Sequence, residues 1–145
     1  MQDVVISIRH EFAESIYSGL KIYELRKQEP HIEVGTCCWI YEPLPVGKVT
    51  GYFIYNGFLK MSKTLLWHRY GHRFGIDIDR YNAYYEGYQQ SIAWRVSMPK
   101  SIEPRPLSDF GIKRAPQSYQ KIEKNTTKTM GFALENPRNY DKTRI

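Results

Sequence analysis

Residues 19–27, Gly-Leu-Lys-Ile-Tyr-Glu-Leu-Arg-Lys, hold the densest group of polar side chains in this chain of 145 residues. The alternation within residues 22–27 predicts a β-strand, in which successive side chains point to opposite faces. Glu24 and Arg26 then share a face and can form an ion pair, whereas Lys21 lies at the loop end, where alternation does not fix its direction. The expected faces are Ile22, Glu24 and Arg26 on one side, and Tyr23, Leu25 and Lys27 on the other.

The Glu24–Arg26 pair has two interpretations. A carboxylate beside a guanidinium offers a hydrogen-bond acceptor and a forked donor to a base or a phosphate. On an open surface, the same pair would be an exposed ion pair of little energetic weight. The spacing of the two residues by itself leaves both interpretations open.

The N-terminal half of the chain predicts short strands around one helix. Strands are expected over residues 3–8 and 36–41, which are rich in β-branched or aromatic side chains. A further strand is expected over residues 48–55, and Gly51 within it indicates a bulge or a close backbone approach. Residues 11–18 predict a helix that ends at Gly19 and whose apolar side chains share one face, namely Phe12, Ala13, Ile16 and Tyr17.

The second half adds two helices before the next strand. Ser62 and Asp77 are suited to cap the N-termini of helices over residues 63–70 and 78–86, which Gly71 and Gly87 would close. After these helices the pattern predicts a strand over 91–97, a proline-rich loop over 99–106, and helical turns over 107–111 and 116–122.

Strands at both ends of the chain with helices between them predict an α+β fold. The expected architecture is a mixed sheet that closes toward a β-barrel and is decorated with short helices. Residues 1–122 are expected to form one domain, and residues 123–145 a basic polar tail that is extended or disordered. Residues 124–145 carry five basic and two acidic side chains and lack apolar periodicity.

The composition favours a polyanionic partner. Lys and Arg number 21 against 15 Asp and Glu, and aromatic residues make up 14% of the chain. Cations can meet phosphates and aromatic rings can stack on bases, although small basic proteins without nucleic-acid partners also exist. No apolar run approaches the roughly 20 residues that span a membrane. Cys37 and Cys38 are adjacent, which argues against a disulfide framework and favours a cytoplasmic location.

Neither a metal site nor a cofactor is expected, because the two cysteines and four histidines show no ligand spacing. The order helix, Gly19-x-Lys21-x-x-Glu24-x-Arg26 is similar to the signature of the ASCH family, a PUA-like group related to RNA-binding domains. Ala115-Pro116-Gln117-Ser118-Tyr119 resembles the closing turn of the larger members that are labelled transcriptional regulators. The stretch from Tyr41 to Gly51 also matches, and the resemblance covers about residues 3–122.

The resemblance implies a cleft beside the first helix that binds RNA or a nucleotide-like ligand, with a regulatory role as a further expectation. Lys21, Glu24 and Arg26 would line this cleft, with Tyr41 and the loop over 42–47 opposite. Some family members are enzymes that remove the acetyl group of 4-acetylcytidine, and one has been described as a ribonuclease. If this chain is such an enzyme, Lys21 would be the activated amine or electrostatic group and Glu24 the general base.

One difference argues against deacetylation. Glu24 stands where the deacetylating relatives have Thr, so the hydroxyl expected as nucleophile is missing. The remaining hypotheses are a binding module, an enzyme acting on RNA or a modified nucleoside, and an interaction domain whose Glu24–Arg26 pair is structural.

Two other groups of residues leave alternatives open. Arg69 and Arg73, with two neighbouring histidines, either contact phosphates or complement a helix dipole. The tyrosine stripe either packs in the core or stacks on a ligand, and consists of Tyr81, Tyr84, Tyr85 and Tyr88.

Overall fold

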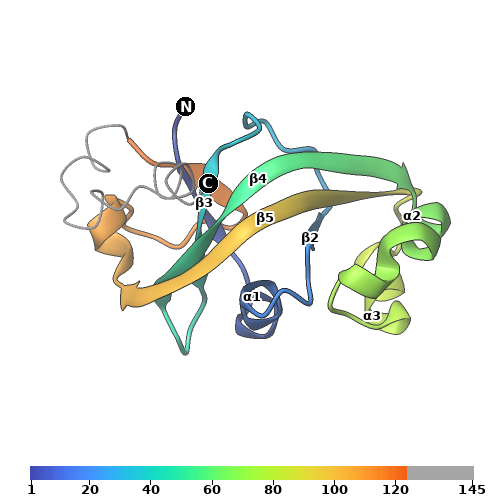
Figure 1. Cartoon of the computed structure of the whole chain (residues 1–145), viewed down its shortest axis with the longest axis horizontal. Helices are drawn as coiled ribbons and strands as arrows, with labels where there is room; N and C mark the ends of the chain where they lie inside the picture. The colour runs from blue at the N-terminus through green and yellow to red at the C-terminus, as the bar shows by residue number, and fades with distance from the viewer. Residues whose placement is uncertain (124–145) are drawn as a thin grey trace.

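The computed structural model describes residues 1–123, which form one six-stranded sheet with three α-helices. Two long antiparallel strands, β4 (Lys48–Ser62) and β5 (Gln90–Arg105), run the length of the molecule, with α1 below them and α2 and α3 at one end (Figure 1). The other elements are β1 (Val4–Ser7), α1 (His10–Tyr17), β2 (Tyr23–Arg26), β3 (Cys37–Glu42), α2 (Lys63–Tyr70), η1 (Gly71–Arg73), α3 (Ile78–Tyr84), η2 (Leu107–Phe110) and β6 (Tyr119–Lys121).

The strand order is β2-β5-β4-β3-β1-β6, and only the β1–β3 pair is parallel. This mixed sheet confirms the α+β class. The expected closure into a barrel is not confirmed, because within residues 1–123 no strand pairing joins β2 to the opposite end of the sheet. The Arg26 side chain instead links β2 to β1, donating to the Ser7 carbonyl oxygen at 2.8 Å.

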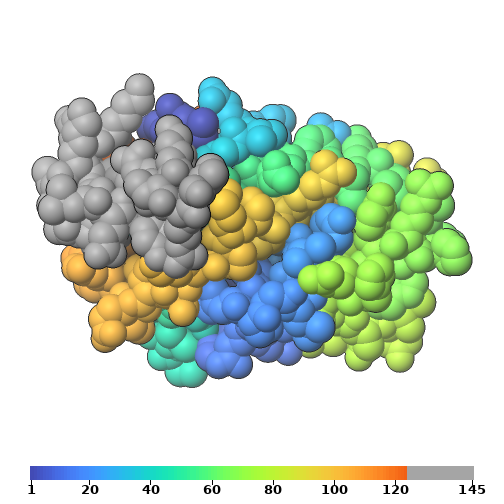
Figure 2. All heavy atoms as spheres, viewed as in Figure 1, coloured from blue at the N-terminus to red at the C-terminus, as the bar shows by residue number. Residues whose placement is uncertain are grey.

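Three apolar clusters hold these elements together. One cluster packs α1 against the sheet through side chains such as Ile16, Ile40 and Trp94. A second covers the opposite face, where Trp39 packs against Phe110 at a ring-centroid distance of 5.3 Å. The third joins α2 and α3 to the far end of the β4–β5 ribbon and contains Leu25, Leu66, Phe74, Tyr81, Tyr85 and Ala93. In Figure 2, the blue segment with α1 and β2 lies between the gold β5 strand and the green helices.

Both predicted helix caps are present. The Ser62 side chain accepts a hydrogen bond from the Leu65 amide at 3.3 Å, and the Asp77 side chain accepts one from the Arg80 amide at 2.8 Å. Helix α3 ends at Tyr84, two residues earlier than expected. The chain then turns at Gly87, whose φ of +84° lies in the left-handed region.

Three expectations about strands were wrong. β4 continues to Ser62 instead of ending at residue 55, and β5 continues through the supposed loop 99–106 to Arg105. The β4 extension pairs with residues 90–94 of β5, and the β5 extension pairs with residues 49–52 of β4. Prolines are tolerated because the ladder changes register several times along this ribbon. The helical turn expected over 116–122 is largely replaced by β6, which pairs with β1 more than 100 residues away in sequence. The expected tail over 123–145 lies, from residue 124 onward, outside the described residues.

Gly51 makes the close approach that the sequence predicted. A Cβ atom at this position would lie 2.3 Å from the Lys100 carbonyl oxygen and 2.5 Å from the Tyr17 hydroxyl. The backbone and a partly buried tyrosine hydrogen-bonded to Thr50 cannot easily give way, so the site admits only glycine. The absence of a side chain here lets α1 pack directly on the β4–β5 ribbon.

We therefore predict that Gly51→Ala lowers the free energy of unfolding by about 2 kcal/mol or more through overpacking. Gly87→Ala is the matched control, because nothing lies within 4 Å of a Cβ there, and its backbone strain should cost only about 1 kcal/mol. Urea unfolding of both variants measures the difference. Equal losses in the two variants would contradict the close approach at Gly51.

Candidate functional site

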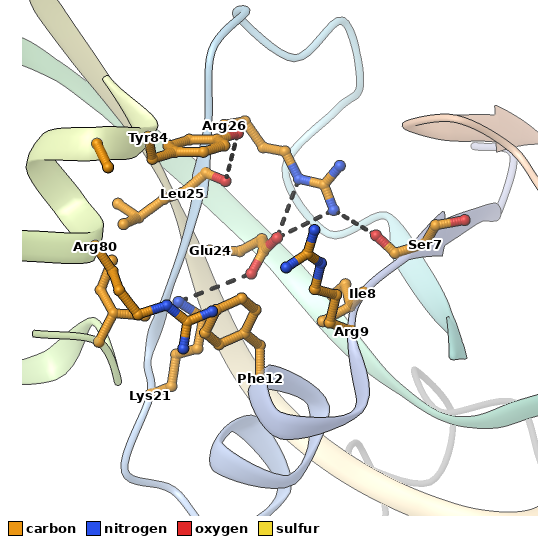
Figure 3. Close-up of a pocket in the computed structure, with 12 residues that line it drawn as sticks. Ser7, Ile8, Arg9, Phe12, Lys21, Glu24, Leu25, Arg26, Arg80 and Tyr84 are labelled. Atoms are coloured by element: carbon orange, nitrogen blue, oxygen red, sulfur yellow. Dashed lines mark hydrogen bonds and ion pairs between the residues drawn. The ribbon is translucent and has the colours of Figure 1, made fainter. Parts of the chain in front are cut away.

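A cleft of about 480 Å³ opens between α1, β2 and α3 (Figure 3). Its walls come from the end of β1, the start of α1, the 19–27 stretch and the outer side of α3. The lining residues are Ser7, Ile8, Arg9, Phe12, Lys21, Glu24, Leu25, Arg26, Ile76, Arg80, Ala83 and Tyr84. Segments distant in sequence therefore contribute to one hollow, and the predicted motif forms its floor.

Lys21, Glu24 and Arg26 form a connected charge network in this floor. One Glu24 carboxylate oxygen lies 3.1 Å from Arg26 Nε and 3.0 Å from an Arg26 Nη, and the other lies 3.8 Å from Lys21 Nζ. The side chains of Lys21 and Glu24 are only 2% and 8% exposed. The Arg26 side chain is 14% exposed. The Glu24–Arg26 pair is thus largely buried, and its interpretation as an exposed surface ion pair was wrong.

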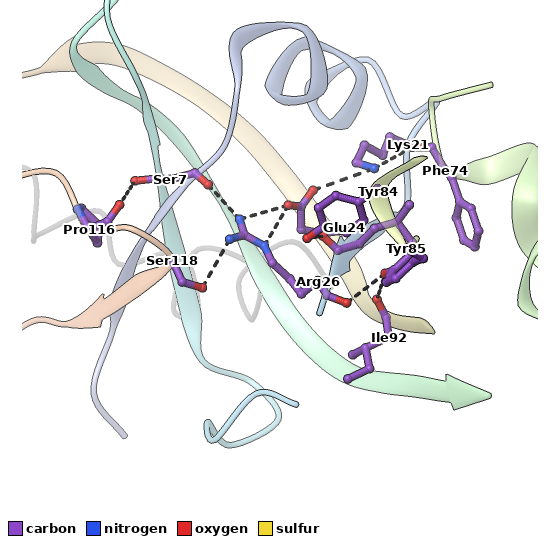
Figure 4. A network of polar contacts seen from close by, with 11 residues as sticks. Ser7, Lys21, Glu24, Arg26, Phe74, Tyr84, Tyr85, Ile92, Pro116 and Ser118 are labelled. Carbon is purple, nitrogen blue, oxygen red and sulfur yellow. Dashed lines mark hydrogen bonds and ion pairs between the residues drawn. The ribbon is translucent and has the colours of Figure 1, made fainter. Parts of the chain in front are cut away.

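The network is tied to the backbone at both ends (Figure 4). Lys21 Nζ donates to the Phe74 carbonyl oxygen at 2.6 Å, which joins β2 to the segment after η1. At the other end, the Arg26 guanidinium donates to the Ser7 carbonyl oxygen and lies 3.4 Å from Ser118 Oγ. The Gly-x-Lys-x-x-Glu-x-Arg motif and the Pro-Gln-Ser turn therefore meet at Arg26.

Burial lowers the pKa of the Lys21 ammonium below its ordinary value. The Glu24 carboxylate opposes this shift, and the positive charge of Arg26 adds to it. An amine with a lowered pKa loses its proton more easily, so Lys21 can exchange a proton with a bound molecule nearer to neutral pH than a surface lysine can.

The cleft also contains cations that sequence reasoning missed. Arg9 and Arg80 are exposed and reach into the cleft from α1 and α3 on opposite sides (Figure 3). The Arg80 guanidinium donates a hydrogen bond to each carboxylate oxygen of Glu11 at 2.9 Å. It also lies 5.0 Å from the centroid of the Phe12 ring. Only the tertiary structure brings α3 beside α1, so no local pattern could have identified Arg80.

Other predicted site residues lie elsewhere. Tyr41 does not line this cleft; it is buried in the cluster on the opposite face of the sheet. Arg69 is exposed on α2 and also does not line it. Arg73 donates to the carbonyl oxygens of Gly19 and Leu20 at 2.8 and 3.3 Å, so it holds the loop that leads to Lys21. The four-tyrosine stripe divides, with Tyr81 and Tyr85 buried and Tyr84 and Tyr88 exposed.

A second polar network, also missed from the sequence, fixes the other side of α1. His10 Nδ1 lies 2.5 Å from one oxygen of Glu42, and the other oxygen accepts from Thr50 at 2.5 Å. Tyr17 Oη lies 2.8 Å from Thr50 Oγ1, so the network returns to the helix. The hydrogen bond to Glu42 raises the pKa of His10, and the charges of Glu14 and Glu42 raise it further.

This network predicts a pH-dependent contribution to stability. Because the folded-state pKa of His10 is raised, the contribution is fully present below its unfolded pKa of about 6.5 and disappears as pH rises through the folded-state value. The difference in urea midpoint between wild type and His10→Gln should therefore shrink from about pH 5.5 to about pH 8.5. His68→Gln, at an exposed position on α2, is the control. A pH-independent difference for His10→Gln would refute this coupling.

The comparisons with known proteins agree with this fold. The chain is 30% identical over 133 residues to a Zymomonas mobilis protein named ASCH domain-containing ribonuclease, covering 89% of this chain and 90% of that one. The chain therefore belongs to the ASCH domain family. No family model matches the sequence.

Solved structures give the same relationship in three dimensions. The crystal structure of ASCH from Zymomonas mobilis matches with a TM-score of 0.81 and 28% identity, covering 88% of this chain and 92% of that one. A single-residue variant of that protein matches with a TM-score of 0.82 and 27% identity, covering 88% and 95% of the two chains. The regulatory role suggested by the sequence resemblance stays a prediction.

None of the helices within residues 1–123 combines the length and the apolar character that spanning a membrane requires. Within the same residues, no three His, Cys, Asp or Glu side chains are grouped closely enough to hold a metal ion.

Proposed function

We propose that this ASCH protein binds single-stranded RNA in the cleft between α1, β2 and α3. The observation that carries the proposal is the charge around the cleft. Three arginines, Arg9, Arg26 and Arg80, and the amine of Lys21 line it, against the Glu24 carboxylate and the Glu11 carboxylate that pairs with Arg80. Such an excess of positive charge in a concave site concentrates anionic ligands. The name of the Zymomonas mobilis relative, a ribonuclease, supports RNA as the anion.

The lining residues divide into two roles in this proposal. Arg9 and Arg80 are exposed and bind the phosphates, whereas the buried network orients the ligand from below. Arg26 is held by Glu24 and the Ser7 carbonyl, so its guanidinium is fixed before a ligand arrives. Phe12 and Tyr84 supply aromatic surface on which a base can stack.

Arg80→Ala should weaken binding of single-stranded RNA about tenfold and reduce the salt dependence of binding by about one counterion. Arg69→Ala is the matched control, because Arg69 is an exposed arginine of the same helical region that does not line the cleft. Fluorescence anisotropy at several salt concentrations measures both effects. An equal loss in Arg69→Ala would place the RNA contact outside this cleft.

We further infer that the cleft cleaves RNA, and the lowered pKa of Lys21 is the observation that favours this second function. The neutral Lys21 amine removes the proton of a ribose 2′-hydroxyl, and the resulting oxygen attacks the adjacent phosphorus. The bond from phosphorus to the 5′-oxygen breaks, this oxygen takes a proton from water, and a 2′,3′-cyclic phosphate remains. Arg9 and Arg26 offset the negative charge that develops on the phosphate oxygens.

Lys21→Met should abolish cleavage while circular dichroism shows a folded protein, because methionine keeps the apolar stem and removes the amine. In the wild type, the cleavage rate above the Lys21→Met background should rise with pH around a midpoint below 10.5, the ordinary lysine value. Glu24→Gln tests the carboxylate with a side chain of the same shape. If Lys21→Met cleaves RNA at the rate of the wild type, the proposed role of this amine is refuted.

The same assay distinguishes the other hypotheses. Release of acetate from 4-acetylcytidine, lost in both variants, would identify an amidohydrolase that uses Lys21 and Glu24. Salt-sensitive RNA binding without any product would identify a binding module. The absence of both RNA binding and product would favour the interaction domain. In that case the network of Lys21, Glu24 and Arg26 is purely structural.

A further inference from the structure

A second hollow of about 510 Å³ lies beyond the end of β2, next to the cleft. Its walls come from the residues after β2, from the outer part of β4 and from the segment between α3 and β5. The lining residues are Lys27, Gln28, Glu29, His31, Lys60, Tyr88, Gln89, Gln90 and Ile92. None of these residues lines the first cleft, so the two hollows have separate linings.

The two hollows meet at one lysine and two tyrosines. Arg26 and Lys27 are consecutive, and the first lines the cleft whereas the second lines the outer hollow. Lys27 Nζ lies 4.6 Å from the ring centroid of Tyr84, which lines the cleft, and 5.4 Å from that of Tyr88, which lines the outer hollow. A cation and two aromatic rings thus span the boundary between the hollows.

Both rings are partly exposed, and the Tyr84 ring is held by its neighbours. Tyr84 and Tyr88 are 37% and 44% exposed, so part of each ring remains free for contact with a ligand. Tyr84 packs edge-on against Tyr85 at a centroid distance of 4.8 Å, and its hydroxyl lies 3.4 Å from the Leu25 carbonyl oxygen. Tyr85 is buried and its hydroxyl lies 2.9 Å from the carbonyl oxygens of both Arg26 and Ile92 (Figure 4). The Tyr84 ring is therefore held against the β2–β5 strand pair.

The charges of the outer hollow also suit an anionic chain. Lys60 pairs with Glu29 at 2.7 Å, whereas the ammonium of Lys27 faces the two tyrosine rings. A cation held on aromatic faces at an exposed site is bound only weakly, by about 1 kcal/mol or less, and can turn to a phosphate. The amides of Gln28, Gln89 and Gln90 line the same hollow and can donate to and accept from the edge of a base.

We propose that the outer hollow is a second nucleotide subsite, which takes the neighbour of the nucleotide bound in the cleft. Tyr88 stacks on the base of this flanking nucleotide, and Lys27 binds the phosphate that links it to the nucleotide in the cleft. Stacking on an aromatic ring requires an unpaired base, so the subsite selects single-stranded RNA over duplex. This inference rests on the proposed function, because it extends the path of an RNA chain that starts in the cleft.

Binding of labelled uridine nucleotides of different lengths tests the subsite. In the wild type, the dinucleotide pUpU should bind about tenfold or more tightly than uridine monophosphate, since one more base is stacked and one more phosphate is bound. Tyr88→Ala should remove most of this gain and leave mononucleotide binding unchanged, whereas Tyr88→Phe keeps the ring and the gain. Lys27→Ala should reduce the gain and lower the salt dependence of dinucleotide binding by about one counterion.

Lys113→Ala, at an exposed position after η2, removes the same charge from a region outside both hollows and should change neither affinity. A full length-dependent gain in both Tyr88→Ala and Lys27→Ala would overturn the second subsite while leaving the cleft as the RNA site. Absence of binding by the wild type at every length would refute the proposed function itself, and the subsite with it.

Discussion

The buried ion network of Lys21, Glu24 and Arg26 is the constraint on which the rest of this structure depends. Charges removed from water are costly unless each has a partner, and removing one partner of such a buried pair typically destabilises a protein by about 3–5 kcal/mol. Here the partners come from different parts of the chain, because Lys21 binds the Phe74 carbonyl and Arg26 binds the Ser7 carbonyl. Satisfying the network therefore requires β1, β2 and the segment after η1 to come together, which places the walls of the cleft.

The same requirement explains why no strand pairing closes the sheet between β2 and β1. β2 pairs only with β5, and β1 lies at the other side of the strand order. Arg26 spans this opening with its guanidinium, where a strand pairing would otherwise continue a barrel. Residues from both edges of this opening line the cleft, so the incomplete closure and the cleft are two aspects of one arrangement.

Membership of the ASCH family limits the function of this chain without fixing it, since one fold can carry several activities. The site of this protein combines a buried lysine with a lowered pKa and exposed arginines. Tyr84 lines this site and also faces Lys27, whose other ring partner is Tyr88. In the proposed function, adjacent surfaces of α3 and β2 would thereby recognise a phosphate and a base.

The sequence by itself determined the features that depend on neighbours along the chain. Strand alternation placed Glu24 and Arg26 on one face, the side chains of Ser62 and Asp77 capped their helices, and Gly51 marked a close approach. These features arise from backbone geometry and short-range hydrogen bonds, which the local sequence encodes.

Only the tertiary structure decided the burial of the ion network, the position of Arg80 beside α1 and the absence of Tyr41 from the cleft. It also decided that β4 and β5 extend together beyond their apolar cores, and that residues after 116 form a strand on β1. Each of these features depends on contacts between segments far apart in the chain. The free energy of a pairing or a burial belongs to both partners, so the sequence of one segment does not reveal it.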